Sequence, residues 1–161
     1  MKSKKYVLLI VVLLASLLLT TATASAKTTR LYFTGAEWCD PDTFIFTRVW
    51  ESGPNLHLDG ITQTCYDTAS IPQLTGTDYL FDARMNLVGG GPNFILSGKL
   101  RMVSDEGGVW VGSWVLPANT TTIQVIAHGE GLYEGQLLHW FLEETGNGSG
   151  PFNGYIVVPD K

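Results

Sequence analysis

Histidines and carboxylates gather in one short stretch of this chain, residues 128–140. Its thirteen residues hold two of the three histidines of the chain, His128 and His139, together with the carboxylates of Glu130 and Glu134 and three glycines. Imidazole and carboxylate groups are the usual partners in acid–base catalysis, and the same groups bind metal ions. The stretch is therefore the first candidate for an active site.

The alternation of a β-strand argues against a catalytic pair within this stretch. We expect a tight turn at residues 129–131 and then a long strand over residues 132–143. Successive side chains of a strand point to opposite faces of the sheet. Glu134 would then lie on one face, whereas Tyr133 and His139 would lie on the other. Glu134 and His139 are accordingly not expected to act together.

The other combinations of histidine and acid are weaker. His128 could approach Glu134 across the hairpin, but a metal site needs at least three converging ligands. His57 and Asp59 share one strand face, and such a pair can orient an imidazole as a general base, although it is as often a surface pair. The chain has no nucleophile elbow, phosphate loop, dinucleotide fingerprint or zinc motif. The sequence predicts no catalytic residue, no metal ion and no cofactor.

Aromatic side chains offer a binding site instead. Trp110 and Trp114 share one face of a predicted strand, with a glycine between them that leaves a shallow slot. Aromatic rims of this kind stack on sugars or enclose apolar ligands, and the same spacing also suits a barrel core. We predict a cavity or rim formed by Trp110, Trp114 and Tyr133, with His128 and Glu134 beside it, for an apolar or saccharide ligand.

The first 26 residues have the layout of a secretory signal peptide. Three lysines precede an apolar run at residues 6–19, and small residues follow as far as Ala24-Ser25-Ala26. The apolar run is shorter than the roughly 20 residues that span a bilayer, which favours cleavage over the alternative, a retained membrane anchor. We predict cleavage after Ala26, a mature domain of residues 27–161, and a secreted or periplasmic protein without membrane attachment.

The charge of the mature chain limits its partners. Removal of residues 1–26 takes away three of the ten basic residues and none of the fifteen acidic ones, so the net charge falls from −5 to −8. Nucleic acids and anionic membranes are bound through basic surfaces. The balance therefore argues against both as partners.

Both cysteines, Cys39 and Cys65, belong to the mature part. An even number of cysteines in an exported chain indicates a disulfide, which would stabilise the fold by roughly 3–4 kcal/mol. The alternative is a metal site or a reactive thiol. Neither cysteine has a histidine or second cysteine at ligand spacing, so we predict a Cys39–Cys65 disulfide.

Short alternating segments separated by glycine and proline indicate an all-β fold. We count about eight or nine antiparallel strands at the spacing typical of a barrel or sandwich. Three glycines predicted in mid-strand, Gly98, Gly112 and Gly135, permit sharp coiling and favour a single closed barrel of about eight strands over a sandwich.

Several local predictions follow from the same pattern. We expect strands at residues 44–50, 56–66 with a bend at Asp59-Gly60, 79–88, 94–103 and 109–116, separated by a loop at residues 67–77, a break at residues 89–92 and a hairpin turn at residues 105–108. In the strand at 79–88, Tyr79, Phe81 and Ala83 should share one face. Asn119 and Asn147 each begin a glycosylation sequence that matters only in a eukaryotic host.

One segment resembles a known family. Gly129-Glu130-Gly131-Leu132-Tyr133-Glu134-Gly135, followed by an apolar strand and a closing Gly154, resembles the late strands of allene oxide cyclase-like and dirigent-like barrels. Residues 107–114 look like the hairpin that precedes this motif in exported bacterial proteins of the same pattern. The resemblance covers residues 74–158 and implies an eight-stranded barrel, an apolar cavity and a homo-oligomer, often a trimer. It carries over no catalytic position.

Two functions remain open from the sequence. The first is a non-catalytic binding or structural module for an apolar or saccharide ligand. The second is a cyclase-like or isomerase-like enzyme that uses acid–base residues at the mouth of the cavity. Proximity of any two among His57, His128, His139, Glu130 and Glu134 inside a pocket would favour the enzyme.

Overall fold

The structure, a computed structural model, describes residues 27–87, 94–146 and 148–160. The predicted signal peptide, the predicted break at residues 89–92 and Asn147 lie outside the described residues. The described strands are β1 (Thr28–Cys39), β2 (Arg48–Ser52), β3 (Asn55–Ala69), β4 (Gly76–Leu87), β5 (Phe94–Ser104), β6 (Val109–Leu116), β7 (Thr122–Glu130), β8 (Leu137–Glu143) and β9 (Gly150–Pro159). Three short 3₁₀ helices, η1 (Pro41–Thr43), η2 (Pro72–Leu74) and η3 (Gly131–Tyr133), connect them. No helix in these ranges is long and apolar enough to cross a membrane.

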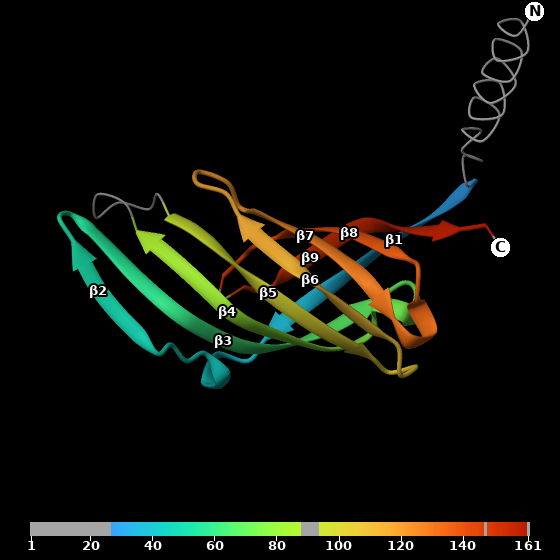
Figure 1. Cartoon of the computed structure of the whole chain (residues 1–161), viewed down its shortest axis with the longest axis horizontal. Coiled ribbons are helices and arrows are strands. Elements are labelled where there is room, and N and C mark those ends of the chain that lie inside the picture. Colours follow the sequence, from blue (N-terminus) through green and yellow to red (C-terminus); the bar gives the residue numbers. More distant parts are fainter. Residues whose placement is uncertain (1–26, 88–93, 147, 161) are drawn as a thin grey trace, which may run out of the picture.

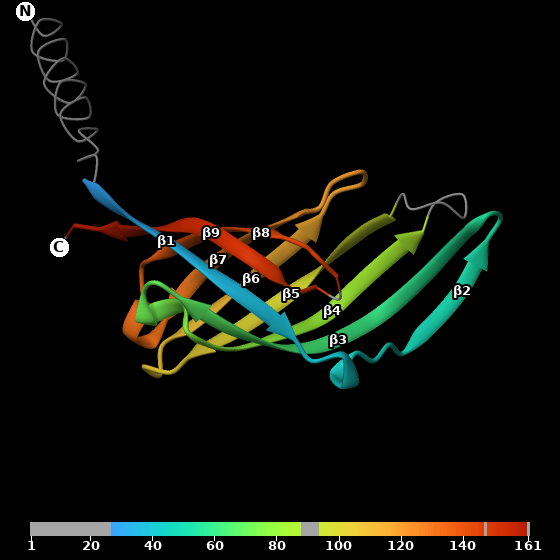
Figure 2. The ribbon, with the colours of Figure 1, turned by 180° about the vertical axis from the view of Figure 1, so that it is seen from behind.

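The strands form one closed antiparallel barrel, as the sequence predicted. Their order in the sheet is β1-β9-β8-β7-β6-β5-β4-β3-β2, and β1 also pairs with β3. This last pairing closes an eight-stranded barrel and leaves β2 outside it (Figure 1). β1 reaches only the C-terminal end of β3, through five residue pairs from Cys39–Cys65 to Gly35–Ala69, and β2 covers the other end of β3 (Figure 2). The β1–β3 pairing is thus the short seam of the barrel.

β3 is longer than predicted. The predicted bend is present, because Gly60 has a positive φ of 65° and the register with β4 shifts on both sides of Ile61. The predicted loop at residues 67–77 is present but shorter, at residues 70–75. Asp67 lies within β3, where it is paired with Glu37 of β1 on one side and Gly76 of β4 on the other, so the strand is held on both sides.

β4 contains a β-bulge, so side chains predicted to share one face point to opposite faces before and after it. Asp82 has a positive φ of 51°, and the register with β5 shifts between Phe81 and Arg84. Ala83 points into the barrel and is 1% exposed, but Tyr79, predicted on the same face, is 46% exposed on the outside. Asp78, one residue before the predicted strand, points inward and is 1% exposed. An extra residue shifts the alternation by one, which exchanges the two faces of the strand on one side of the bulge.

The stretch that first suggested an active site is a turn. β7 continues to Glu130, η3 follows, and β8 begins only at Leu137, so the predicted strand at residues 132–143 is confirmed for residues 137–143 and wrong for residues 132–136. Gly131 and Gly135 have φ values of 63° and 81°, a conformation that interrupts a strand and that glycine adopts readily. The side chain of Tyr133 packs against Trp110 and is 4% exposed.

Two of the three predicted mid-strand glycines do lie within strands. Gly112 faces the neighbouring strand so closely that a Cβ would collide with the carbonyl oxygen of Ile126, and a Cβ on Gly98 would lie 2.6 Å from that of Ala83. Both close approaches accompany the coiling of the sheet. Gly135 is instead a turn residue, between η3 and β8.

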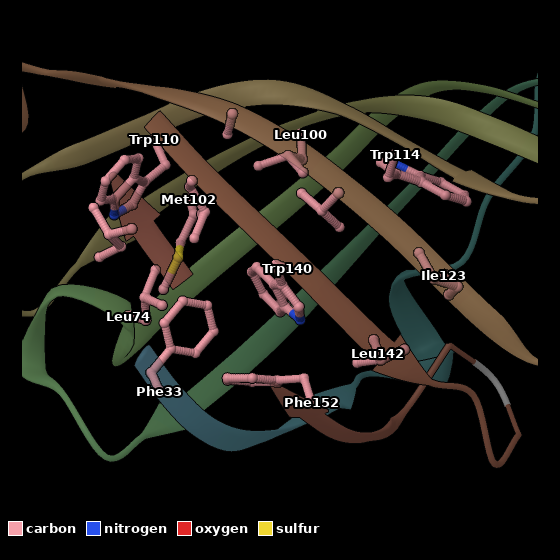
Figure 3. Close-up of a cluster of buried hydrophobic side chains, with 14 of the residues drawn as sticks. Phe33, Leu74, Leu100, Met102, Trp110, Trp114, Ile123, Trp140, Leu142 and Phe152 are labelled. Atoms are coloured by element: carbon pink, nitrogen blue, oxygen red, sulfur yellow. The ribbon is translucent and has the colours of Figure 1, made fainter. Parts of the chain in front are cut away.

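The interior has two distinct ends (Figure 3). Leu74, Met102 and Trp110 are fully buried at one end, and Tyr133 stacks on Trp110 there with 5.1 Å between ring centroids. Trp114 and Leu142 lie towards the other end. The packed end closes the barrel, and the second end contains the cavity described next.

Candidate functional site

A cavity of about 400 Å³ lies inside the barrel, within the size range of sites for small molecules. Phe44, which is 37% exposed, contributes from the segment between η1 and β2, where the sequence predicted a strand. Ile45 of that segment makes only a single bridge, to Thr62 of β3. The apolar wall consists of Pro41, Phe44, Leu80, Met85, Leu96, Leu100, Trp114, Leu116, Ile123, Val125, Trp140 and Leu142, and the polar part of Glu37, Gln63, Asp78, Glu144 and Gly148.

Three buried acids meet beside this cavity. Glu37 of β1, Asp67 of β3 and Asp78 of β4 each offer a carboxyl oxygen, and these oxygens all lie within 4.8 Å of one another. Their exposed fractions are 9%, 3% and 1%. Glu37 is directly opposite Asp67 in the β1–β3 seam, and Asp78 is opposite Cys65 in the β3–β4 pairing, so these two pairings together bring the carboxyls together. Glu37 and Asp78 belong to the cavity wall.

The surroundings of the three acids oppose ionisation. Burial raises the pKa of Glu37 well above its usual range, and the charges of Asp67 and Asp78 raise it further. Burial and then the charge of Asp78 raise the pKa of Asp67 in the same way. Burial raises the pKa of Asp78 to about 7, although a hydrogen bond from the backbone N–H of Tyr79 works in the opposite direction. The surroundings therefore favour the protonated forms of Glu37 and Asp67, and Asp78 is divided between the acid and the anion near neutral pH.

Two buried polar atoms of the cavity wall have no protein partner among the described residues, Oδ1 of Asp78 and Nε1 of Trp140. The Asp67 carboxyl, in contrast, shares a side-chain hydrogen bond with Glu37. The indole nitrogen of Trp140 is on the side of Leu142 (Figure 3), and both residues line the cavity. Among the described residues of the cavity wall there is no lysine, arginine or histidine. Unpaired buried polar atoms are costly, so this wall is suited to a molecule that supplies the missing partners.

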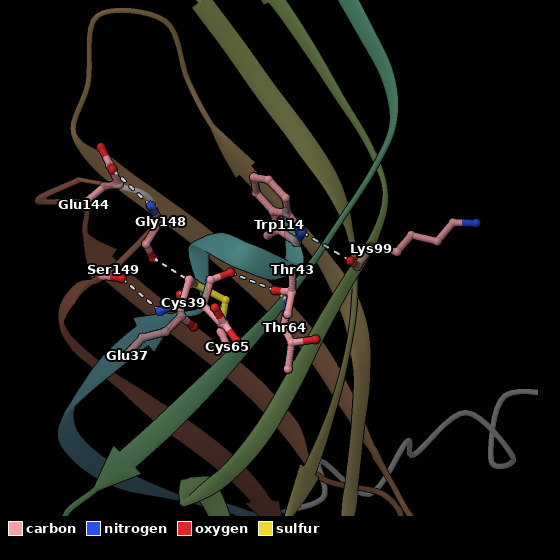
Figure 4. Close-up of a disulfide and its surroundings, with 11 residues drawn as sticks. Glu37, Cys39, Thr43, Thr64, Cys65, Lys99, Trp114, Glu144, Gly148 and Ser149 are labelled. Carbon is pink, nitrogen blue, oxygen red and sulfur yellow. Dashed lines mark hydrogen bonds between the residues drawn. A yellow bond between two sulfur atoms is a disulfide. The ribbon is translucent and has the colours of Figure 1, made fainter. Parts of the chain in front are cut away.

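The predicted disulfide is present, and it joins β1 and β3, two of the three strands that carry the cluster. Cys39 and Cys65 are bonded across the seam, both almost fully buried (Figure 4). Sγ of Cys39 lies 3.5 Å from a carboxyl oxygen of Glu37. A disulfide sulfur carries no hydrogen, so any hydrogen bond here must be donated by a protonated Glu37. The Ser149 hydroxyl accepts a hydrogen bond from the Cys39 backbone N–H at 2.9 Å, which ties the β8–β9 loop to the same point.

The structure separates the five residues predicted to bind a ligand. Trp114 lies in the cavity wall, and its Nε1 donates a hydrogen bond to the Lys99 carbonyl oxygen at 3.2 Å. Trp110 and Tyr133 are stacked in the packed end of the barrel and do not line the cavity. His128 and Glu134 lie on the outer surface, because β7 presents His128 outward and Glu134 belongs to the turn after η3. The predicted rim is therefore not a single site.

The histidines do not form an acid–base centre in the cavity. His128 Nε2 lies 3.8 Å from a Glu130 oxygen, but both side chains are more than half exposed. His139 stacks on Tyr155 on the outside of the barrel, with 4.8 Å between ring centroids. Glu134 lies in the turn after η3 and not on a strand, so the predicted placement of Glu134 and His139 on opposite faces of one strand is wrong.

The predicted pair of His57 and Asp59 also has other partners. The ring of His57 stacks on Trp50, and Nδ1 lies 2.6 Å from Oδ1 of Asn86. Asp59 binds Arg48 at 2.9 Å and Arg84 at 2.8 Å. These arginines pair with the carboxylate and lower its pKa, whereas His57 contacts Trp50 and Asn86.

Sequence reasoning missed the carboxyl cluster, although one signal was available. Cys39 and Cys65 were predicted to be bonded, and a bond across two antiparallel strands places both cysteines on the inner face. Counting two residues from each cysteine then places Glu37 and Asp67 on that face as well. Asp78 could not be found in this way, because the bulge at Asp82 changes the face of β4.

Comparison of the chain with known proteins found no matching family model, no matching curated protein and no matching solved structure. The cavity and its carboxyl cluster are therefore the basis for a functional proposal.

Proposed function

We propose that this protein binds a small, predominantly apolar molecule inside the barrel, in a compartment outside the cytoplasm. The observation that carries the proposal is the cavity of about 400 Å³, with its largely apolar wall, in a protein whose other end is tightly packed. Protein interiors are close-packed, and voids much larger than a water molecule are few. A cavity of this size is the default site for a small ligand.

The wall favours an apolar ligand over a saccharide. A sugar carries a hydroxyl on almost every carbon, and each buried hydroxyl needs a hydrogen-bond partner. Here the polar groups of the wall are few, whereas leucine, isoleucine, valine, methionine and tryptophan side chains form most of it. We infer a ligand with an apolar body and one polar end.

Two features support a location outside the cytoplasm. The Cys39–Cys65 disulfide is stable in oxidising compartments, and the first 26 residues have the pattern of a secretory leader. The eight-stranded barrel also agrees with the resemblance to allene oxide cyclase-like and dirigent-like barrels, and kinship with them is part of the proposal.

Binding can be tested with N-phenyl-1-naphthylamine, an uncharged probe whose fluorescence increases in apolar sites. We expect saturable binding to the full chain and loss of binding in Leu80→Trp, which fills the cavity from its wall. Tyr79→Trp is the matched control, since the neighbouring side chain is outside the barrel. If Leu80→Trp does not fold, Met85→Trp fills the same cavity from another position in its wall. Absence of binding to the unmodified protein, or equal binding by the filled variants, would overturn the proposal.

One observation favours a second candidate, an isomerase-like proton transfer. Asp78, with a pKa of about 7, and Glu37, with a pKa well above its usual range, face the same apolar cavity. An anionic Asp78 could remove a proton next to a carbonyl group, while a neutral Glu37 donates a hydrogen bond to the carbonyl oxygen. Hydrogen–deuterium exchange of apolar ketones in D₂O, followed by mass spectrometry, tests this function. Exchange no faster with the unmodified protein than with Asp78→Asn would exclude it.

A further inference from the structure

We propose that the cavity binds amphiphilic amines, with the protonated amine between Glu37 and Asp78 and the apolar chain along the wall of the barrel. The inference rests on the proposed binding function and identifies the chemical class of the ligand. Both carboxyls belong to the cavity wall, so a ligand in the cavity reaches them directly.

The spacing of the carboxyls matches one ammonium group. An oxygen of Glu37 and an oxygen of Asp78 lie within 4.8 Å of each other. Two N–H bonds of an ammonium diverge at the tetrahedral angle, so acceptors about 2.8 Å from the nitrogen are about 4.6 Å apart. A single nitrogen can therefore donate one hydrogen bond to each carboxyl.

An acceptor in this wall lacks a donor. Oδ1 of Asp78, a residue that is 1% exposed, has no hydrogen-bond partner among the described residues. The described part of the wall has no basic side chain to balance an ionised acid. An ammonium group supplies donors and positive charge at once, and charge-assisted hydrogen bonds of this kind are about twice as strong as neutral ones.

The same features disfavour other polar ends. An alcohol offers one donor and no charge, and a carboxylate would add a fourth acid to the three already present. A divalent cation such as Ca²⁺ takes six to eight oxygen ligands and is strongly hydrated, whereas most of this wall is apolar. An organic ammonium keeps its apolar chain against that wall and so gains from both parts of the cavity.

A series of ligands with one chain length tests the inference. Displacement of N-phenyl-1-naphthylamine from the full chain is measured at pH 7.5 with n-octylamine, 1-octanol and octanoic acid. We expect the Kd of octylamine to be about tenfold or more below that of octanol, because one charge-assisted hydrogen bond contributes a ratio of this size. Octanoate should bind most weakly of the three. The double variant Glu37→Gln/Asp78→Asn should lose the preference for the amine and keep the affinity for octanol. Glu134→Gln, an exposed acid outside the cavity, is the control and should retain the preference.

The outcomes separate the inference from the function on which it rests. Equal binding of octylamine and octanol overturns the amine site and leaves the apolar cavity in place. Displacement by none of the three ligands contradicts the proposed function itself. Displacement by CaCl₂ alone, without a preference for octylamine, shows a metal site instead and also overturns the inference. Thermal unfolding checks that the double variant is folded, and Glu37→Gln alone repeats the test if it is not.

Discussion

At the scale of single residues, Asp78 shows how burial changes an ordinary side chain. An aspartate on a protein surface is ionised at neutral pH, but Asp78 is 1% exposed and its pKa is raised to about 7. Its Oδ1 has no partner in the described part of the chain, whereas the surface residue Asp82 binds Lys99 at 3.0 Å. The same carboxyl group therefore titrates near neutral pH at Asp78 and forms an ion pair with a lysine at Asp82.

Replacement of Asp78 by asparagine should stabilise the protein at high pH. At pH 8 the folded protein must bury the Asp78 anion, whereas asparagine has the same shape and no charge. We expect the gain in the free energy of unfolding from Asp78→Asn to be about 2–4 kcal/mol larger at pH 8 than at pH 5. Urea unfolding at both pH values measures the effect, with the surface variant Asp82→Asn as control. Equal destabilisation at both pH values would contradict the burial argument.

At the scale of elements, the β1–β3 seam controls both closure and the site. It has only five residue pairs, and the disulfide is at its last pair. The seam also carries Glu37 and Asp67 as a direct cross-strand pair. Opening the seam should therefore loosen the barrel and disturb the cavity together.

Loss of the disulfide should weaken both stability and binding. The bond joins cysteines separated by 26 residues. For a loop of this length, the double variant Cys39→Ala/Cys65→Ala should lose about 3–4 kcal/mol of unfolding free energy, and its affinity for N-phenyl-1-naphthylamine should fall. Denaturant unfolding and probe titration measure the two effects, and reduction of the unmodified protein should reproduce them. Unchanged binding in a folded double variant would show that the cavity does not depend on the seam.

The elements also show what sequence alone can predict. The hairpin of β5 and β6 was predicted well, since Asp105 to Gly108 is an obvious turn and β6 alternates without interruption. The face of β4 was half wrong because a bulge at Asp82 depends on pairing with β5 rather than on residue type. The carboxyl cluster was missed for the same kind of reason: Glu37, Asp67 and Asp78 come from three strands and meet only through register. The histidines drew attention by their chemistry but lie outside the cavity.

At the scale of the whole molecule, the two ends of the barrel contribute differently to the free energy of unfolding. Buried apolar side chains stabilise one end, whereas a cavity and buried acids lower the stability of the other. The end around Trp110 and Tyr133 is fully packed, whereas the other half contains a cavity and three buried acids. The Cys39–Cys65 disulfide stabilises the end that contains the cavity and the buried acids. Such a division is expected in binding proteins, in which the site is held by a more stable scaffold.

This division predicts an unusual dependence of stability on pH. The pKa values of Glu37, Asp67 and Asp78 are all raised in the folded protein, so between about pH 4 and 7 the folded state binds more protons than the unfolded state. The free energy of unfolding should therefore be highest near pH 4–5 and should fall as the pH rises through 7. Each of the three acids faces the other two, and Glu144 is the only further ionisable group among the described residues of the cavity wall. Unfolding by urea from pH 4.5 to 8.5 measures the curve.

A triple variant separates this effect from other titrations. Glu37→Gln/Asp67→Asn/Asp78→Asn removes all three buried carboxyls and should flatten the curve between pH 5 and 8. Addition of n-octylamine at pH 8 should restore stability to the unmodified protein, because an ammonium ligand compensates the anions that destabilise the fold. The triple variant should gain nothing from the amine beyond what 1-octanol provides. A rise in stability from pH 5 to 8 in the unmodified protein would mean that the three acids are ionised at little cost, and that the cavity is more polar than its wall indicates.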